Sequence, residues 1–401
     1  MSAEFKFLTK CLGPAELVDQ PDWVACAKSL DVDWGVLLEM ARKHGVVSSV
    51  FVALKPEIQQ LPSDCQQSFK REYHTGIGRN VFVAEEFRRV MAIFKTAQID
   101  VIPYKGPMLS NHLFDSPAFR ESKDIDLVVH RKDVIRAKQL LLKNGYQSDG
   151  DLSEREEVFL FSSRKESSYD LKLPYPSGKG KRLKIELHWK VPLTSNVPPD
   201  WYWQHLEWQE FGTLPVRCFT AETLMLILLC HGFRHYWESL KWLSDIDRLI
   251  RNTKSFRWDH LLELSSELGV RRVVVFGLVL SRELLGTRLP DDVQVALDAD
   301  AFVLSLIPGA VENMTGAHRC PVGFRNNILI RERVGDRFLY LKNILDYVFV
   351  PDLTDFKRLP LPRLLWPCYW ILRPIKVLSC LRNKYGVRSI RRVLFGKTKS
   401  A

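Results

Sequence analysis

Two aspartates stand two residues apart where a β-rich run begins, and this spacing could serve a metal ion. The run extends from Asp124 to His130. Side chains at positions i and i+2 of a strand point to the same face, so Asp124 and Asp126 would converge while Ile125 enters the core. Paired carboxylates suit Mg²⁺, which prefers oxygen ligands and keeps substrate phosphates in its coordination shell. By itself, however, this spacing is more often a solvated strand end.

The same D-x-D spacing occurs at two other places in the chain. Asp245 and Asp247 lie in a helical pattern, where side chains two residues apart diverge around the axis. Asp298 and Asp300 form the other pair. Neither of these two pairs makes a good metal site on its own. Whether Asp124 and Asp126 form one therefore depends on the residues around them.

Two neighbouring segments supply further candidates for such a site. Upstream, Lys105 and Gly106 lie at an expected strand-to-helix turn, where backbone amides and a helix N-terminus can receive phosphate. Downstream, Glu186 and His188 share one face of an expected strand. Glu186 would complete the metal site, or position or deprotonate an attacking hydroxyl, and His188 would contact phosphate or acceptor. The alternatives are an exposed lysine, an exposed strand glutamate and a hydrogen-bonded structural histidine.

A later helical pattern holds four polar residues that could border a cleft. His231 and His235 stand four residues apart on one face, and Lys241 and Asp245 follow. Simple structural packing is one alternative. Zinc binding by the two histidines is another, but no H-E-x-x-H motif is present to support it. Three neighbouring residues are expected in the core: Trp242, Leu243 and Ile246.

The pattern of apolar residues and helix breakers predicts helices at both ends of the chain and a compact α/β unit between them. Helices are expected up to about residue 75 and from about residue 80 to 97. The α/β unit comprises a strand at 99–104, a short helix opened by Pro107, a strand at 124–130, a helix between Asp133 and Asn144, and strands at 169–175 and 183–191 joined by a turn at 177–181. Long helical patterns follow at 221–251 and 258–285.

These elements predict an α+β protein in four parts. The parts are an N-terminal helical segment at 1–78, a core at 79–195, a helical domain at 196–350 and a basic, aromatic-rich tail at 351–401. A chain of 401 residues with 46% hydrophobic and 26% charged residues is long and apolar enough for several packed cores.

The net charge of +11 is concentrated at one end of the chain. Residues 357–401 contain twelve Lys or Arg and no Asp or Glu, which leaves a net charge of −1 on the first 356 residues. A nearly neutral body argues against a nucleic-acid polymerase or a tRNA-modifying enzyme. The tail mixes Trp366, Tyr369 and Trp370 with basic residues. It is compatible with lying on an anionic membrane surface, or with a basic, partly packed tail.

Several of these segments together resemble a known family. They are Tyr104-Lys105-Gly106, Arg120 with Asp124-Ile125-Asp126-Leu127-Val128-Val129, the helix up to Gly145-Tyr146, Glu186-Leu187-His188-Trp189, and His231-Gly232, His235 and Trp237 followed by Leu240-Lys241-Trp242-Leu243-Ser244-Asp245-Ile246-Asp247. In combination they are similar to the uncharacterised bacterial nucleotidyltransferase family of the polymerase-β-like superfamily. The resemblance covers roughly residues 80 to 290. One departure from the wider superfamily is Lys105-Gly106, where Gly-Gly or Gly-Ser is usual.

The resemblance implies a fold and a reaction. The core would be a small mixed sheet with flanking helices. Asp124, Asp126 and Glu186 would bind two Mg²⁺ ions, with Mn²⁺ as a substitute, and Lys105, Gly106 and Arg120 would contact the phosphates of a nucleoside triphosphate. An acceptor hydroxyl would attack the α-phosphorus and release pyrophosphate. The acceptor and the base of the nucleotide do not follow from the sequence.

Other functions compete with this one. A scaffold or nucleotide-binding module without turnover would keep the fold, and a toxin that nucleotidylates RNA or protein would keep the motifs. Eight cysteines without paired spacing and a charged N-terminus indicate a cytoplasmic protein. The tail would place it peripherally at the inner face of the membrane.

Overall fold

A mixed five-stranded sheet carries the carboxylates of the D-x-D motif. The structure is a computed structural model that describes residues 1–13, 22–148, 156–157, 168–175, 182–191, 193, 197, 201–316, 324–377 and 379. The strand order is β1-β2-β5-β4-β3, in which β2 and β5 are parallel and the other neighbours antiparallel. The strands are β1 (Val101–Pro103), β2 (Asp124–Val129), β3 (Gln147–Ser148), β4 (Ser168–Pro174) and β5 (Arg182–His188).

The pairing of β2 with β5 sets the position of the acidic residues. Asp126 lies opposite Glu186 in the parallel register. Residues that alternate with these carboxylates, Ile125, Leu127 and Ile185, are fully buried in the core. The expected alternation of acidic and apolar faces is therefore confirmed on both strands.

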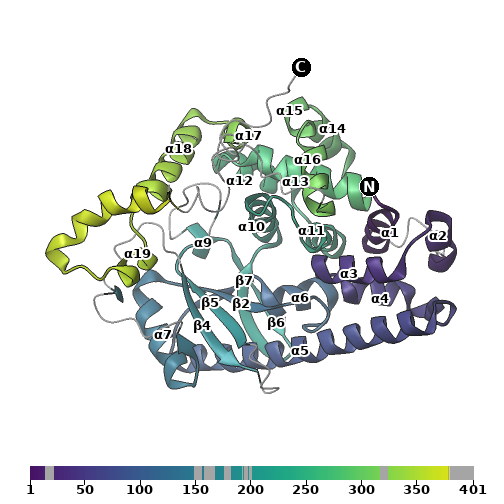
Figure 1. Cartoon of the computed structure of the whole chain (residues 1–401), viewed down its shortest axis with the longest axis horizontal. Coiled ribbons are helices and arrows are strands. Elements are labelled where there is room, and N and C mark those ends of the chain that lie inside the picture. Colours follow the sequence, from purple (N-terminus) through teal and green to yellow (C-terminus); the bar gives the residue numbers. More distant parts are fainter. Residues whose placement is uncertain are drawn as a thin grey trace.

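Helices cover the sheet and extend well beyond it (Figure 1). The short helix opened by Pro107 is α6 (Gly106–Phe114). The next helix, α7 (Val134–Lys143), ends at Asn144 as expected, but the side chain of Asp133 makes no capping hydrogen bond. A 3₁₀ turn, η3 (Arg131–Asp133), precedes α7, so Asp133 is already in helical geometry and cannot act as the extended cap. The expected turn at 177–181 lies outside the described residues.

One long helix, α5 (Ser63–Thr96), connects the N-terminal helices to the sheet and runs along the lower edge of Figure 1. The sequence predicted this helix only from about residue 80, because Gly76 and Gly78 weaken the helical pattern. The expected boundary between residues 78 and 79 thus falls inside a continuous helix. Preceding it are α1 (Ala3–Leu12), α2 (Trp23–Leu30), α3 (Trp34–His44), α4 (Val47–Leu54) and η2 (Lys55–Gln60).

A β-hairpin lies near the start of residues 196–350, which were expected to form a helical domain. Its strands, β6 (Leu206–Phe211) and β7 (Leu214–Phe219), pair across Gly212, which has a φ of 63°. β7 contacts β1, so the hairpin extends the core beside the sheet. The prediction failed because the alternation in a strand as short as β6 is a weak signal beside the stronger helical pattern that follows.

The remaining helices are α9 (Trp201–Gln204), α10 (Ala221–Arg234), α11 (Leu240–Asn252), α12 (Trp258–Glu267), α13 (Arg271–Leu285), α14 (Asp291–Asp298), α15 (Ala301–Leu304), α16 (Ile307–Thr315), α17 (Phe324–Leu329), α18 (Val334–Phe349), α19 (Leu353–Arg358) and η4 (Arg363–Cys368). Most of them lie above the sheet in Figure 1, and α18 and α19 lie on its left side. Among the helices that the structure describes, none is both long and apolar enough to cross a membrane.

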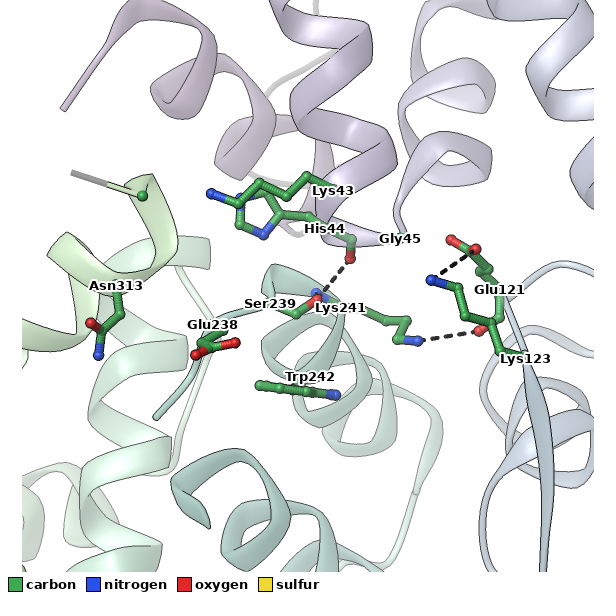
Figure 2. A pocket seen from close by; sticks show the side chains of 11 residues that line it. Lys43, His44, Gly45, Glu121, Lys123, Glu238, Ser239, Lys241, Trp242 and Asn313 are labelled. Carbon is green, nitrogen blue, oxygen red and sulfur yellow. Dashed lines mark hydrogen bonds and ion pairs between the residues drawn. The ribbon is translucent and has the colours of Figure 1, made fainter. Parts of the chain in front are cut away.

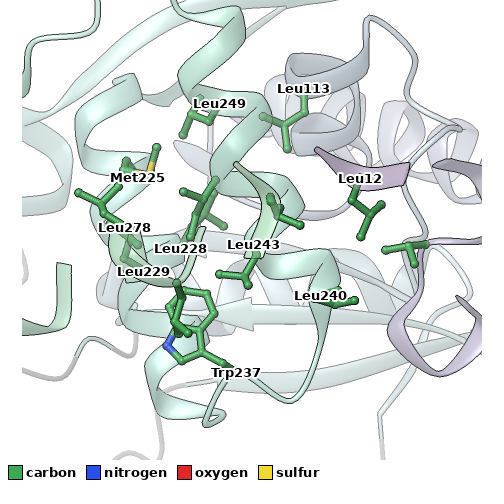
Figure 3. Packing of buried hydrophobic residues seen from close by; sticks show 14 of the residues in the cluster. Leu12, Leu113, Met225, Leu228, Leu229, Trp237, Leu240, Leu243, Leu249 and Leu278 are labelled. Atoms are coloured by element: carbon green, nitrogen blue, oxygen red, sulfur yellow. The ribbon is translucent and has the colours of Figure 1, made fainter. Parts of the chain in front are cut away.

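The predicted helix at 221–251 is broken into α10 and α11 by a tight turn. Tyr236 and Trp237 have φ values of 52° and 54° there. The Trp237 ring packs so closely on two glycines that an added Cβ would lie 2.5 Å from it at Gly232 and 2.7 Å at Gly277. Figure 3 shows Trp237 among the leucines of α10, α11 and α13. This cluster continues into α1, so the N-terminal and C-terminal helices share one core.

Candidate active site

Three acidic residues meet on one face of the paired strands β2 and β5. Asp126 is buried, whereas Asp124 and Glu186 are half-buried. Ligand atoms of Asp126, Glu186 and His188 lie within 4.8 Å of one another, close enough to hold one metal ion. Asp124 is not part of this group of three, but it lines the same cavity. The donor set is rich in oxygen and suits Mg²⁺ or a similar hard cation.

The imidazole of His188 lies between the carboxylates. Its Nε2 is 3.4 Å from Asp126 Oδ1, 3.2 Å from Glu186 Oε2 and 3.2 Å from the Tyr104 hydroxyl. Burial lowers the pKa of His188, but the two carboxylates raise it by more, so the net pKa is raised. A positive charge is therefore favoured at this point, which is what a cation site requires.

The two aspartates of the D-x-D motif differ in their electrostatics. Burial, Asp126 and Glu186 all raise the pKa of Asp124. Burial also raises the pKa of Asp126, but Lys105 and His188 outweigh it and the net pKa is lowered. Asp124 is thus the carboxylate whose charge the site stabilises least, and a bound cation would stabilise it.

The turn between β1 and α6 fits closely against β2. Gly106 has a φ of 63°, and an added Cβ would lie 2.9 Å from the Asp124 carbonyl oxygen. A glycine is required there because of both the left-handed backbone and the close approach. Lys105 Nζ donates to His231 Nδ1 at 3.0 Å, and burial lowers the pKa of Lys105. This contact brings α10 to the edge of the acidic face.

Arg120 and Asp245 form a buried ion pair in the wall of the site. Arg120 Nε donates to Asp245 Oδ1 at 2.6 Å, and Nη2 donates to Oδ2 at 2.8 Å. Both side chains are nearly excluded from solvent. The two-pronged contact fixes α11 to the segment that leads into β2.

That segment is also held by α5. The Asn80 side-chain amide donates to the carbonyl oxygens of Ala118 and Arg120 at 2.8 and 3.1 Å, and its oxygen accepts from the Ser122 amide at 3.3 Å. Arg79 contacts Glu121 at 3.0 Å. The sequence did not single out Asn80, because a polar residue inside an amphipathic helix gives no local sign of a partner 38 or more residues away.

These elements enclose a cavity of about 350 Å³, which we call the acidic cavity. Nine residues predicted from the sequence line it: Lys105, Arg120, Asp124, Asp126, Glu186, His188, His231, His235 and Lys241. The predicted residues Gly106 and Asp245 do not line it, although Asp245 binds Arg120, which does. Four lining residues were missed as site residues: Tyr104, Glu121, Arg234 and Trp242.

The sequence predicted Trp242 in the core with Leu243 and Ile246. The two aliphatic residues are fully buried, as predicted, but Trp242 is only half-buried and lies against His231 and His235. The helical pattern places Trp242 at the border of the apolar stripe, where an aromatic ring can serve either the core or a cavity. His231 lies on α10 and His235 directly follows it; their ring centroids are 4.6 Å apart, and both residues line the acidic cavity.

Fold and site together define an α+β nucleotidyltransferase core flanked by helices. The chain belongs to the uncharacterised nucleotidyltransferase family, whose model matches residues 31–286. The match begins well before the stretch from about residue 80 that carried the resemblance, so it includes α3, α4 and all of α5. Membership supports transferase activity with a nucleotide as donor.

Comparison with solved structures finds a distant likeness. The crystal structure of an antigenic nucleotidyltransferase-like protein from Paracoccidioides brasiliensis is similar at 19% identity, over 55% of this chain and 92% of that chain, with a TM-score of 0.34. No curated protein matches the chain.

Proposed function

We propose that the protein transfers a nucleoside monophosphate from a nucleoside triphosphate to a hydroxyl group of an acceptor. The observation that carries this proposal is the convergence of Asp124, Asp126 and Glu186 in a cavity that also holds several cations. Phosphoryl transfer needs neutralisation of charge and in-line positioning more than covalent help. The acidic cavity offers carboxylates that can bind a metal ion and cations that can hold phosphate, within about 350 Å³.

The carboxylates are assigned to metal binding. Asp126 and Glu186 would hold Mg²⁺, Asp124 would complete the site, and the resemblance implies two ions there. Bound Mg²⁺ neutralises the triphosphate and the leaving pyrophosphate. Glu186, 3.2 Å from His188, would either bind the metal or accept the proton of the attacking hydroxyl. The acceptor oxygen forms a bond to the α-phosphorus as the bond to the pyrophosphate oxygen breaks.

The cationic residues of the acidic cavity divide into two roles. Lys105, Arg234 and Lys241 line the cavity and would contact phosphate oxygens. Arg120 was predicted to contact phosphate, but its guanidinium is committed to Asp245, so we assign it to positioning the wall. Burial and then Arg120 lower the pKa of Lys241 to about 8, so this amine stays mostly charged at neutral pH.

The proposal is tested by calorimetric titration of each of four nucleoside triphosphates, with Mg²⁺, with Mn²⁺ and without metal. We expect metal-dependent binding of at least one nucleotide by the wild type, and its loss in the variant Asp124→Ala/Asp126→Ala. The matched control is Asp291→Ala/Asp292→Ala, which removes two exposed carboxylates from α14. No binding by the wild type, or undiminished binding by the first variant, would overturn the proposal.

We further propose that the C-terminal region docks on an anionic membrane. Most of the exposed large apolar side chains of the described residues lie here: Val334, Phe338, Leu345, Tyr347, Phe349, Leu359, Leu364, Leu365, Trp370, Ile371, Leu372 and Ile375. No residue of α18 is buried. Of the three aromatic residues that made the tail compatible with a membrane surface, Tyr369 is buried beside Phe356 and Trp366 is half-buried, as a partly packed tail would have them, and Trp370 is exposed.

Vesicle sedimentation tests this docking. The full chain should sediment with vesicles containing phosphatidylserine and much less with phosphatidylcholine alone, and added salt should release it. The variant Trp370→Ser/Ile371→Ser/Ile375→Ser should lose binding, while the control Val36→Ser/Val52→Ser, which alters exposed residues elsewhere, should keep it. Equal sedimentation of both variants would contradict the proposal.

A further inference from the structure

A second and larger cavity, of about 470 Å³, lies beside the acidic cavity. We call it the lysine cavity, after Lys43, Lys123 and Lys241 in its walls (Figure 2). The two cavities share three lining residues, Glu121, Lys241 and Trp242. The two cavities are therefore adjacent, and these three residues lie between them. Both have volumes in the range of small-molecule sites rather than of a groove for a polymer.

The walls of the lysine cavity come from segments far apart in the sequence. The end of α3 supplies one side, the segment before β2 another, and the start of α11 the floor, with α16 opposite. Hydrogen bonds hold α3 to α11: Ser239 Oγ donates to the His44 carbonyl oxygen at 2.8 Å, and the Leu240 amide donates to His44 Nδ1 at 3.2 Å. Lys241 Nζ donates to the Glu121 carbonyl oxygen at 3.3 Å. The cavity is thus built in advance of any ligand.

The lining residues indicate the chemistry of the ligand. Lys43 and Lys123, with Lys241 shared between the two cavities, outnumber the carboxylates Glu121 and Glu238, so the lining favours an anionic group such as a phosphate. Trp242 offers a ring edge or face against which a sugar ring can pack, and Glu238 and Asn313 can exchange hydrogen bonds with hydroxyl groups. The same mixture would serve poorly for an apolar ligand.

The nucleotide is not the occupant that this cavity fits. Its triphosphate must lie on the metal-binding carboxylates, and Asp124, Asp126 and Glu186 all line the acidic cavity and not the lysine cavity. An acceptor in the neighbouring cavity could present a hydroxyl across the wall formed by Lys241 and Trp242. An acceptor bound there would lie beside the nucleotide and not in its place, which favours the proximity that the reaction needs.

We propose that the lysine cavity binds the acceptor, and that the acceptor is a small phosphorylated polyhydroxy compound such as a sugar phosphate. The assignment rests on the proposed nucleotidyl transfer. In the reaction, a hydroxyl oxygen of the sugar phosphate bonds to the α-phosphorus of the nucleotide and pyrophosphate leaves. The hydroxyl proton passes to a carboxylate of the acidic cavity.

Calorimetry with defined probes tests the assignment. The full chain is titrated, with Mg²⁺ present, with glucose 1-phosphate, glucose 6-phosphate, ribose 5-phosphate and glycerol 3-phosphate, and separately with glucose and inorganic phosphate. We expect at least one phosphorylated compound to bind more tightly than glucose or phosphate alone. Lys43→Met should weaken that binding about tenfold or more, since it removes a charge-assisted contact. The control Lys132→Met removes an exposed lysine outside both cavities and should change nothing.

Two further arms keep this test separate from that of the nucleotide site. If Lys43→Met lowers the melting temperature, Lys123→Met carries the test, because the Lys123 side chain is 74% exposed. Metal-dependent nucleotide binding should persist in both lysine variants. Failure of all four phosphorylated probes, or binding unchanged by Lys43→Met and Lys123→Met, overturns the acceptor assignment alone. Absence of nucleotide binding in the wild type overturns the proposed function instead.

Discussion

The D-x-D spacing occurs on both β2 and α11, but it brings the two carboxylates together only on the strand. On the strand, Asp124 and Asp126 line one cavity. On the helix, Asp245 binds Arg120 on one side, while Asp247 accepts from Thr287 Oγ1 at 2.9 Å and binds Arg251 on another. The period of the element therefore decides whether two carboxylates form one site or two separate anchors.

The two pairs also differ in how their charge is balanced. Asp245 has a guanidinium partner within the protein, held by two hydrogen bonds. Asp124 instead faces two like charges, Asp126 and Glu186, which together with burial raise its pKa. The like charges around Asp124 indicate a place for a cation, whereas the guanidinium that pairs with Asp245 indicates a structural role.

Among the substitutions that test this contrast, Asp124→Asn is expected to have the largest effect. Metal-dependent pyrophosphate release should fall by at least about 10³-fold, because a metal contributes several kcal/mol of charge stabilisation in the transition state. The free energy of unfolding should stay the same or rise, since the substitution removes a charge that burial and its neighbours disfavour. Activity assays and urea denaturation measure the two quantities, and a variant that is active or clearly destabilised would break the comparison.

Asp245→Asn should show the reverse pattern. It leaves the buried guanidinium of Arg120 without its anion, which costs about 3 kcal/mol or more of stability. Urea denaturation at neutral pH provides the measurement. Near-normal stability would mean that Arg120 has another use for its charge, such as the phosphate contact predicted from the sequence.

Gly106→Ala tests how the strand pair is supported. The left-handed backbone and the close approach to the Asp124 carbonyl oxygen should together cost about 2 kcal/mol. Nucleotide affinity should weaken as well, because the added methyl group pushes against the backbone that carries Asp124. A matched substitution, Gly309→Ala on α16, meets no atom within 4 Å and should be nearly neutral.

The smallest expected effect is the pH dependence of Asp247→Asn. Burial raises the pKa of Asp247 above its ordinary 3.8, although Arg251 and Thr287 partly oppose this. The folded state therefore favours the protonated form, and this contribution to stability is lost as pH rises from about 3.8 through the folded-state pKa. The stability of the wild type relative to Asp247→Asn should fall with rising pH, by at most about 1.4 kcal/mol per unit. Urea titrations between pH 4 and 7 should show this slope, and a difference that grows with pH would contradict it.

What the sequence predicted correctly depends on short-range periodicity. The face shared by Asp124 and Asp126, the third carboxylate Glu186 and the two histidines of α10 all follow from spacing within one element. The α+β class follows from the order of such elements. The pairing of β2 with β5 does not follow from spacing: the sequence offered Glu186 as a third carboxylate, and the resemblance supported its place beside Asp124 and Asp126.

What the sequence did not show depends on contacts between distant segments. Glu121 and Arg234 enter the acidic cavity because Asn80 and Lys105 hold their segments there, and no local pattern reports such contacts. The lysine cavity combines α3, α11 and α16 and is invisible in any one of them. The turn at Trp237 required a match with Gly277, 40 residues later in the chain, which is a tertiary constraint rather than a propensity.

The unbroken α5 has a consequence for how substrates enter. Its N-terminal half packs against the N-terminal helices, which include α3, and its C-terminal half packs against the sheet. One helix therefore supports the elements that line both cavities. A hinge between the N-terminal helices and the sheet would have to bend this helix, which contains no proline and stays continuous through its two glycines, Gly76 and Gly78. We therefore expect the N-terminal helices and the sheet to keep their relative positions while substrates enter and leave.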